Sequence, residues 1–254
     1  MRVALLVTRP TPDRAANLAA LLQRAEDAAR AGATLLLFPE AALTGLLNDD
    51  DPAHDLPLGE TIPGPATDAL AAFTRRRGVW LGLGLLERDG GCLYDTAVLL
   101  DPHGETRLRY RRLQPQWHGP QADPAVYRQG SEIAVTSTPF GTVSFLVCGD
   151  LFDDGIVDRL RAARPDLLLV PFARCFADGA VEQARWEREE LPAYCARVRR
   201  VGVPALLVNY LGDALLGDGS FGGAFAISTQ GEVLAALPLG VEETLYVELD
   251  EVTR

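Results

Sequence analysis

Short apolar runs alternate with amphipathic stretches along most of this chain. A run bounded by polar residues or glycine is typical of a buried strand, and apolar residues repeating every three or four positions are typical of a helix. We therefore expect strands at 2–7, 34–40, 79–88, 92–104, 105–113, 166–173 and 204–210, two more within 132–147, and antiparallel strands over 221–250. Helices are expected at 13–33, 64–78, 154–165 and about 181–201.

The order of these elements predicts the fold class. Strands and helices alternate at both ends of the chain, whereas hairpin-type turns such as "RDGG" and "DPHG" join the strands between them. This arrangement favours an α/β protein with mixed sheets covered by helices. Neither a linker rich in proline and serine nor a repeat of fixed period interrupts it, so we expect a single domain over residues 1–254.

The composition narrows the choice of partners. The chain has 254 residues, of which 48% are hydrophobic, and its formal net charge is −11. Nucleic acids and anionic membranes require a concentrated basic surface, so neither is an expected partner. The apolar run at the N-terminus is too short for a secretory signal, and no segment offers the roughly 20 consecutive apolar residues that span a bilayer. We expect a cytoplasmic protein.

Cysteine and histidine usage argues against a metal centre. The chain has four cysteines and three histidines, all dispersed and without the pairwise spacing of a zinc site. The acidic stretch "NDDDP" at 48–52 lacks the remaining ligand spacing of a calcium loop. We therefore expect neither a zinc site nor a calcium site. Lysine is absent, and all 24 basic residues are arginine.

Polar residues end four of the expected buried strands. Glu40, Cys148, Arg174 and Asn209 each follow an apolar run. Ligands of α/β sheets bind beyond the carboxyl ends of strands, where loops bring side chains from different strands together. A buried cysteine is often only a packing residue. A thiol beside a carboxylate or a positive charge can instead act as a nucleophile, and the four strand ends favour a shared site.

The motifs along the chain resemble those of the nitrilase superfamily of carbon–nitrogen hydrolases. The family's glutamate, lysine and cysteine motifs are similar to "LLLFPEAALTG" (35–45), "RYRRLQP" (109–115) and "FLVCGDLF" (145–152). The stretches "RPDLLLVPFA", "LPAYCARVRRVGVPALLVN" and "GGAFAISTQGEVLA" follow in the family's order. The resemblance covers nearly the whole chain and implies a four-layer αββα sandwich with two mixed sheets, assembled into a homodimer or larger homo-oligomer.

The resemblance also implies a reaction and the residues that perform it. Glu40 would be the general base and then the acid, Cys148 the nucleophile that forms a thioester, and Arg112 the cationic member of the triad. The backbone N–H of Gly149 would help to hold the oxyanion. The implied substrate is a small amide, in preference to a nitrile, hydrolysed without a metal or cofactor.

The chain departs from the family pattern at several positions. Arg112 stands where the family has lysine, and a guanidinium is larger, planar and does not deprotonate. Gly149 replaces an aromatic residue, which should widen the pocket. Arg200 stands where the family has a structural carboxylate. A second family glutamate corresponds by spacing to Asp123, which could act in the site, although a residue before Pro124 is more simply a turn residue.

Three residues are candidates for binding the substrate. Phe172 and Arg174 lie where the family's pocket forms, and Arg174 could either hold a substrate carboxylate or lie on the surface. Trp117 lies in the long irregular segment and could line the mouth of the pocket. Two other functions stay open: a catalytically impaired protein that binds a small molecule or a partner, and an acyltransferase that uses the same cysteine.

Overall fold

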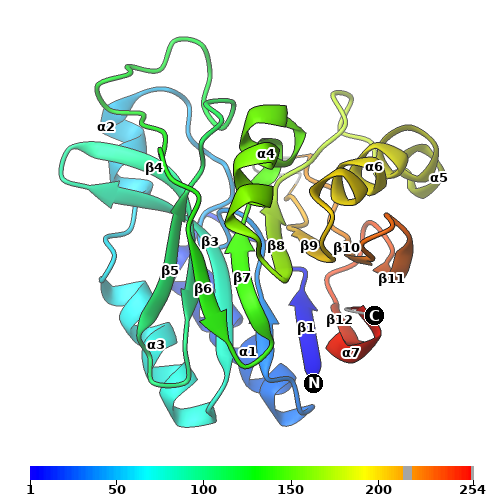
Figure 1. Ribbon diagram of the computed structural model, residues 1–254. Coiled ribbons are helices and arrows are strands. Elements are labelled where there is room, and N and C mark those ends of the chain that lie inside the picture. Colours follow the sequence, from blue (N-terminus) through cyan, green and yellow to red (C-terminus); the bar gives the residue numbers. More distant parts are fainter. Residues whose placement is uncertain (214–218, 253–254) are drawn as a thin grey trace.

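In the computed structural model, which describes residues 1–213 and 219–252, the apolar runs pair into two six-stranded sheets (Figure 1). Sheet A contains, in spatial order, β12 (Thr244–Glu248), β1 (Arg2–Leu6), β2 (Leu35–Leu37), β3 (Trp80–Asp89), β4 (Cys92–Leu100) and β5 (Thr106–Arg111). Sheet B contains β11 (Val233–Leu237), β10 (Ala224–Ile227), β9 (Ala205–Asn209), β8 (Leu167–Phe172), β7 (Gly141–Phe145) and β6 (Val135–Thr138).

The two sheets share one pattern of strand directions. In sheet A, β12 is antiparallel to β1, the strands β1, β2 and β3 are parallel, and β4 and β5 each return antiparallel. In sheet B, β6 is antiparallel to β7, the strands β7, β8 and β9 are parallel, and β10 and β11 return antiparallel. Both sheets are therefore mixed, as the order of elements predicts.

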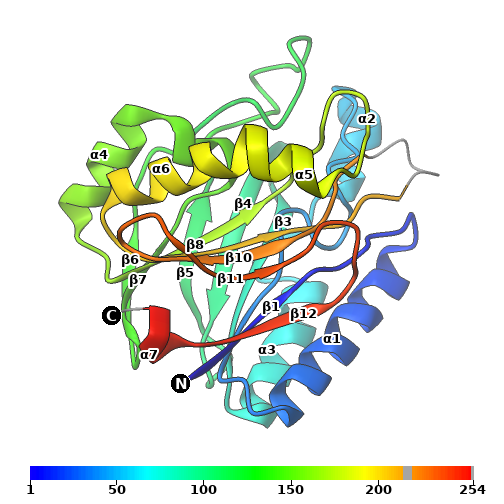
Figure 2. The ribbon, with the colours of Figure 1, turned by 90° about the vertical axis from the view of Figure 1, so that its right-hand side faces the viewer.

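Helices cover the outer faces of the sheets. Helices α1 (Arg14–Arg30) and α3 (Pro65–Arg77) lie on sheet A, and α4 (Asp154–Ala163) and α6 (Leu191–Val201) lie on sheet B (Figures 1 and 2). The four-layer αββα arrangement is thus confirmed. The shorter elements are α2 (Pro52–Asp55), η1 (Leu56–Leu58), η2 (Cys148–Phe152), α5 (Gln183–Arg185), η3 (Trp186–Glu190) and α7 (Leu249–Val252).

Side chains of the central strands alternate between two apolar cores. In β1, Val3 and Leu5 join the core that contains Phe145 of sheet B, whereas Ala4 and Leu6 join the core beneath α1 and α3. This alternation follows from the two-residue period of a strand, and it explains why strands buried on both faces read as continuous apolar runs. Contacts between β1 and β9 join the two sheets. That residues 1–254 form one domain stays a prediction.

Several predicted boundaries are close, and one element differs. The Asp13 side chain accepts hydrogen bonds from the first turn of α1, and Gly78 ends α3 with a left-handed φ of 66°. The helix expected at 181–201 is instead divided into α5, a π-helical turn (η3) and α6. Among the described residues, no helix is both long and apolar enough to cross a membrane.

Candidate active site

Glu40 lies in a tight turn just beyond β2 and is fully buried. The neighbouring strand β3 holds this turn, because Gly84 N donates to Pro39 O at 3.0 Å and Ala42 N donates to Gly84 O at 2.9 Å. Only a glycine fits in the middle of β3 here, since a Cβ at position 84 would lie 2.5 Å from the Glu40 Cα. The "GLG" of this strand therefore serves to position the carboxylate.

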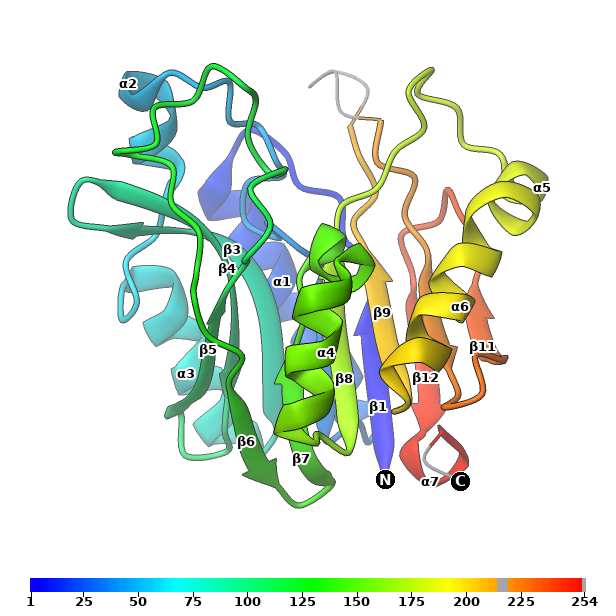
Figure 3. The same cartoon turned by 45° about the horizontal axis from the view of Figure 1, so that its top comes forward.

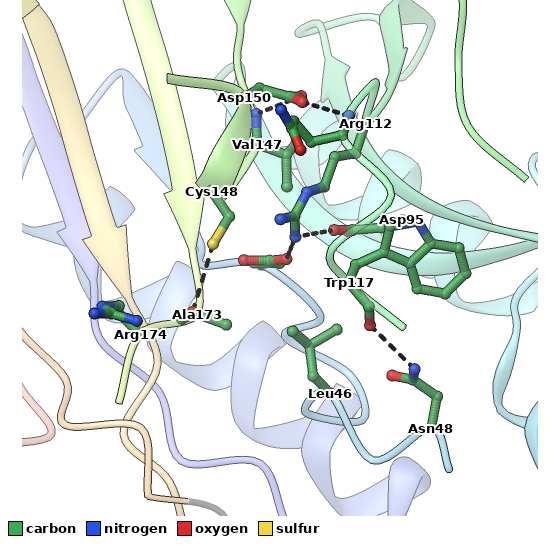
Figure 4. Close-up of polar contacts among 12 residues, drawn as sticks. Leu46, Asn48, Asp95, Arg112, Trp117, Val147, Cys148, Asp150, Ala173 and Arg174 are labelled. Atoms are coloured by element: carbon green, nitrogen blue, oxygen red, sulfur yellow. Dashed lines mark hydrogen bonds and ion pairs between the residues drawn. The ribbon is translucent and has the colours of Figure 1, made fainter. Parts of the chain in front are cut away.

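Arg112 follows β5, and its backbone continues the pairing with β4 through a hydrogen bond from Arg112 N to Asp95 O at 2.8 Å. Its side chain is buried, and Nη1 donates to Glu40 Oε1 at 3.0 Å and to Asp95 Oδ2 at 3.3 Å. In Figure 4 the guanidinium lies between Cys148 on one side and Asp95 on the other. One cation thus joins the carboxyl group of the turn after β2 to that of Asp95 on β4.

Cys148 is the first residue of the 3-10 turn η2, which begins shortly after β7 ends. Its φ of 48° lies in a region that non-glycine residues seldom adopt, and such backbone strain is concentrated at functional sites. The side chain is half-buried, and Sγ donates to Ala173 O at 3.5 Å (Figure 4). The thiol therefore lies at the end of sheet B without being sealed in the core.

Asp150 connects this turn to the segment that follows β5. Its carboxylate accepts hydrogen bonds from Tyr110 Oη at 2.7 Å, from Gln114 N at 2.8 Å and from Leu113 N at 3.2 Å. Burial raises the pKa of Asp150 to about 6, and these donors oppose the shift. Asp150 thus fixes the position of the thiol-bearing turn relative to Arg112.

The ionisable groups at the site change one another's pKa values strongly because they are buried. Burial, followed by the charge of Asp95, raises the pKa of Glu40 well above its ordinary value, and Arg112 acts in the opposite direction. Burial works to lower the pKa of Arg112, but Cys148, Glu40 and Asp95 together raise it. The guanidinium therefore stays charged.

A cavity of about 650 Å³, in the size range of small-molecule sites, opens onto Arg112 and Cys148. Arg112, Cys148 and Gly149 line it. The rest of its lining is contributed by Gln114, Gln116, Phe152, Ala173, Arg174, Glu189, Glu190, Ala193 and Tyr194. A Cβ at position 149 would lie 2.8 Å from Arg112 Nη2, so Gly149 leaves room for the guanidinium. In Figure 3 the chain leaving β5 and the chain leaving β8 lie at the same end of the two sheets, and α6 runs along the side of sheet B.

Four of the residues named from the sequence do not line this cavity. Glu40 is fully buried and contacts the lining residue Arg112. Trp117 is buried against Tyr127, with ring centroids 5.8 Å apart. Asp123 is exposed, and its side chain accepts a hydrogen bond from Ala125 N at 2.8 Å, which is the turn geometry of the simpler interpretation. Phe172 is fully buried and packs behind Tyr194.

Arg174 does line the cavity, but its guanidinium already has a partner. Nε and Nη2 donate to the two carboxylate oxygens of Glu190, at 2.7 and 2.5 Å. Arg200, the other departure from the family pattern, lies on the outer face of α6 and pairs with Asp154 and Asp158 of α4. Its position is thus compatible with the packing of these two helices.

Only one group of described side chains has ligand atoms close enough for a metal ion, namely Asp49, His54 and Asp55. The buried Asp55 carboxylate already accepts hydrogen bonds from Asp49 N, from Asp50 N and from Tyr127 Oη. This group lies outside the cavity described above.

Sequence reasoning did not identify Asp95, Asp150 or Tyr194 as parts of the site. A carboxylate inside the apolar run "CLYDTAVLL" was a signal for Asp95, because a charged residue in a buried strand needs a partner. Asp150 belongs to the quoted cysteine motif, but the sequence alone indicates no role for it. Nothing in the local sequence marks Tyr194, which reaches the cavity from α6.

The chain is similar to known proteins over almost its whole length. The family model described as carbon-nitrogen hydrolase matches residues 2–254. A deaminated glutathione amidase of Yersinia enterocolitica is 29% identical over 67% of this chain, and the match spans 61% of that relative's length. An aliphatic nitrilase of Sinorhizobium fredii is 24% identical over 98% of this chain and 86% of its own.

Solved structures include an amidase of Nesterenkonia sp. with a TM-score of 0.78 and 26% identity, matching 97% of this chain and 89% of that one. In that structure the acetamide moiety of fluoroacetamide is covalently added at the active-site cysteine.

Proposed function

This chain belongs to the carbon–nitrogen hydrolase family, and from that premise we propose that it hydrolyses the C–N bond of a small amide through a thioester on Cys148. The observation that carries the proposal is the shared cavity. Arg112 contacts Glu40 at 3.0 Å and lines the same space as the Cys148 thiol, which is half-buried. A cation and a nucleophile thus line a cavity in which a small molecule fits, and the buried base contacts the cation.

In the proposed reaction, Glu40 takes the proton of the Cys148 thiol while the sulfur attacks the amide carbon. The negative charge that develops on the amide oxygen is held by the Arg112 guanidinium and by the backbone N–H of Gly149. Glu40 then returns its proton to the amine, the C–N bond breaks and the amine leaves. Water, deprotonated by Glu40, attacks the thioester carbon, and the acid leaves as sulfur regains its proton.

The test is a panel of short aliphatic amides and the matching nitriles, followed by ammonia release. We expect turnover of amides above nitriles, and a loss of at least about 10³-fold in Cys148→Ser and in Glu40→Gln. Cys92→Ser is the matched control, because Cys92 lies outside the cavity. Undiminished turnover by folded Cys148→Ser would refute the proposal.

Arg112 is the departure that leaves a catalytically impaired protein in consideration. If the native guanidinium is adapted to its two carboxylates, Arg112→Lys will be less active than the native protein. A clear gain of activity in Arg112→Lys would mark the native protein as impaired. An acyltransferase would instead give a new amide or hydroxamate when an amine or hydroxylamine is added, so product analysis distinguishes it.

The relatives support a family activity but leave assembly open. We propose a homodimer or larger homo-oligomer, and light scattering over a range of concentrations tests it, since a monomer throughout would contradict it. A location in the cytoplasm stays a prediction.

A further inference from the structure

We propose that Asp95 is a positioning residue of this site: with Glu40 it forms a carboxyl pair beneath Arg112 that holds one proton, and loss of that proton makes Glu40 the base for Cys148. This inference rests on the proposed function and deepens it. It assigns a role to a second carboxyl group, on β4, which belongs to neither the glutamate, the lysine nor the cysteine motif.

The geometry brings both carboxyl groups to a single donor. Arg112 Nη1 donates to Glu40 Oε1 at 3.0 Å and to Asp95 Oδ2 at 3.3 Å, and both acidic side chains are completely buried. The other oxygens, Glu40 Oε2 and Asp95 Oδ1, are buried without a hydrogen-bond partner among the described residues. A proton held by the pair makes one carboxyl a donor to the other, which is the partner that two ionised carboxylates lack.

The charges around the pair do not balance without that proton. Among the described residues, Arg112 is the only cation paired with either carboxylate. The other ionisable groups that bear most on the pKa of Glu40 and of Arg112 are Cys148 and Asp150, from η2, and neither is a cation. Arg174 lines the same cavity, but its guanidinium pairs with Glu190. Two buried carboxylates against one guanidinium leave an uncompensated negative charge, and such a charge is relieved by binding a proton.

The pair suits the chemistry of a thiol nucleophile. A general base works best when its proton affinity approaches that of the group it deprotonates, and an ordinary carboxylate is a much weaker base than a thiolate. Burial and the charge of Asp95 both raise the pKa of Glu40. Asp95 therefore strengthens Glu40 as a base, while activity begins only at the pH where the pair loses its proton.

The test compares the pH dependence of kcat/KM in the native protein and in Asp95→Asn, which has nearly the same shape. Without the second negative charge, the pKa of Glu40 falls, so the acid limb of the profile should move down by about one pH unit or more. The maximal rate should fall several-fold because Glu40 is then a weaker base. A uniform loss of activity with the acid limb unmoved would overturn the proposal, because that is the result of a purely structural role.

Asp101→Asn is the matched control. Asp101 is a buried carboxylate just beyond the other end of β4, about 20 Å from Asp95 along the strand, and it accepts backbone hydrogen bonds in a turn. The Asp101→Asn variant should leave the acid limb of the pH profile unmoved. A limb that moves equally in both variants would contradict a specific pairing of Asp95 with Glu40.

A second readout requires neither turnover nor a folded Asp95 variant. Infrared difference spectra between the native protein and Glu40→Gln, recorded in a pH series, should show a protonated carboxyl band that persists well above the pH at which exposed carboxyls ionise. If the band is present but no amide is hydrolysed, the carboxyl pair stands and the proposed function fails. If the band disappears already at the pH at which exposed carboxyls ionise while amides are hydrolysed, the pair fails and the proposed function stands.

Discussion

Gly149→Ala is a direct test of how closely Arg112 fits its site. The φ of Gly149 is outside the left-handed region, so alanine causes no backbone strain there. Its Cβ would lie 2.8 Å from Arg112 Nη2, whereas ordinary contact begins at 3.4 Å, and the guanidinium must therefore retreat by about 0.6 Å. It cannot do so freely, since Glu40 and Asp95 hold it by hydrogen bonds of 3.0 and 3.3 Å.

A displacement of about 1 Å at a catalytic group costs about 100-fold in rate. We therefore expect kcat/KM of Gly149→Ala to fall by about 10- to 100-fold, which corresponds to about 1.4–2.7 kcal/mol of transition-state stabilisation. The free energy of unfolding should change by less than about 1 kcal/mol, because alanine also restricts the unfolded chain. Amide hydrolysis and urea denaturation measure the two effects.

The control and the partner variant make this prediction specific. Gly91→Ala is the matched control, because a Cβ at that turn position meets nothing within 4 Å. In an Arg112→Lys background the Nη2 atom is absent, and Gly149→Ala should then cost less than about 3-fold, so the two substitutions should be non-additive. An equal loss in both backgrounds, or no loss in the native one, would refute the steric reasoning.

Three further predictions concern stability and thiol reactivity. Glu87→Gln should lower the free energy of unfolding by about 2 kcal/mol in urea denaturation. The reason is that the buried Glu87 carboxylate accepts a hydrogen bond from Thr96 and pairs with the partly exposed Arg109 and Arg111. An unchanged denaturation midpoint would contradict this prediction. Asp150, with a folded pKa of about 6 against an ordinary 3.8, binds its proton more tightly when folded. Stability should therefore fall by up to about 3 kcal/mol as the pH rises from about 4 to about 6, and urea titrations of Asp150→Asn should lack this component. Cys148 should react with iodoacetamide near neutral pH much faster than Cys92, and Arg112→Gln should slow it at least about 10-fold by removing the positive charge; equal rates of the two cysteines in peptide mapping would count against an activated thiol.

The strands and helices could be predicted largely because burial on both faces leaves a local signature. Continuous apolar runs such as 2–7 and 166–173 contain β1 and β8. Asp13 caps the start of α1 and Gly78 the end of α3, at the positions that the sequence predicts. The broken helix after residue 181 could not be predicted from periodicity. Trp186, the first residue of the π-helical turn, packs against Tyr194 and Phe221. Neither contact is encoded by helical periodicity.

Part of the candidate site could be predicted because three of its residues stand in local sequence motifs. Glu40, Arg112 and Cys148 stand in recognisable motifs, and the structure brings Arg112 into contact with Glu40 and into the same cavity as Cys148. Asp95 joins them only because β4 and β5 pair in a register that places Asp95 beside Arg112. Trp117 illustrates the converse, since a large aromatic residue in a long loop can pack into a core of its own.

The division of the candidate site between the two sheets has a consequence for how activity would be lost. Glu40, Asp95 and Arg112 extend from one sheet, and Cys148 extends from the other. Neither sheet carries all of the groups that we propose to react, so turnover would depend on the correct contact between the two sheets. A solvent or substitution that shifts one sheet relative to the other should abolish turnover, while the circular dichroism spectrum stays that of the native protein.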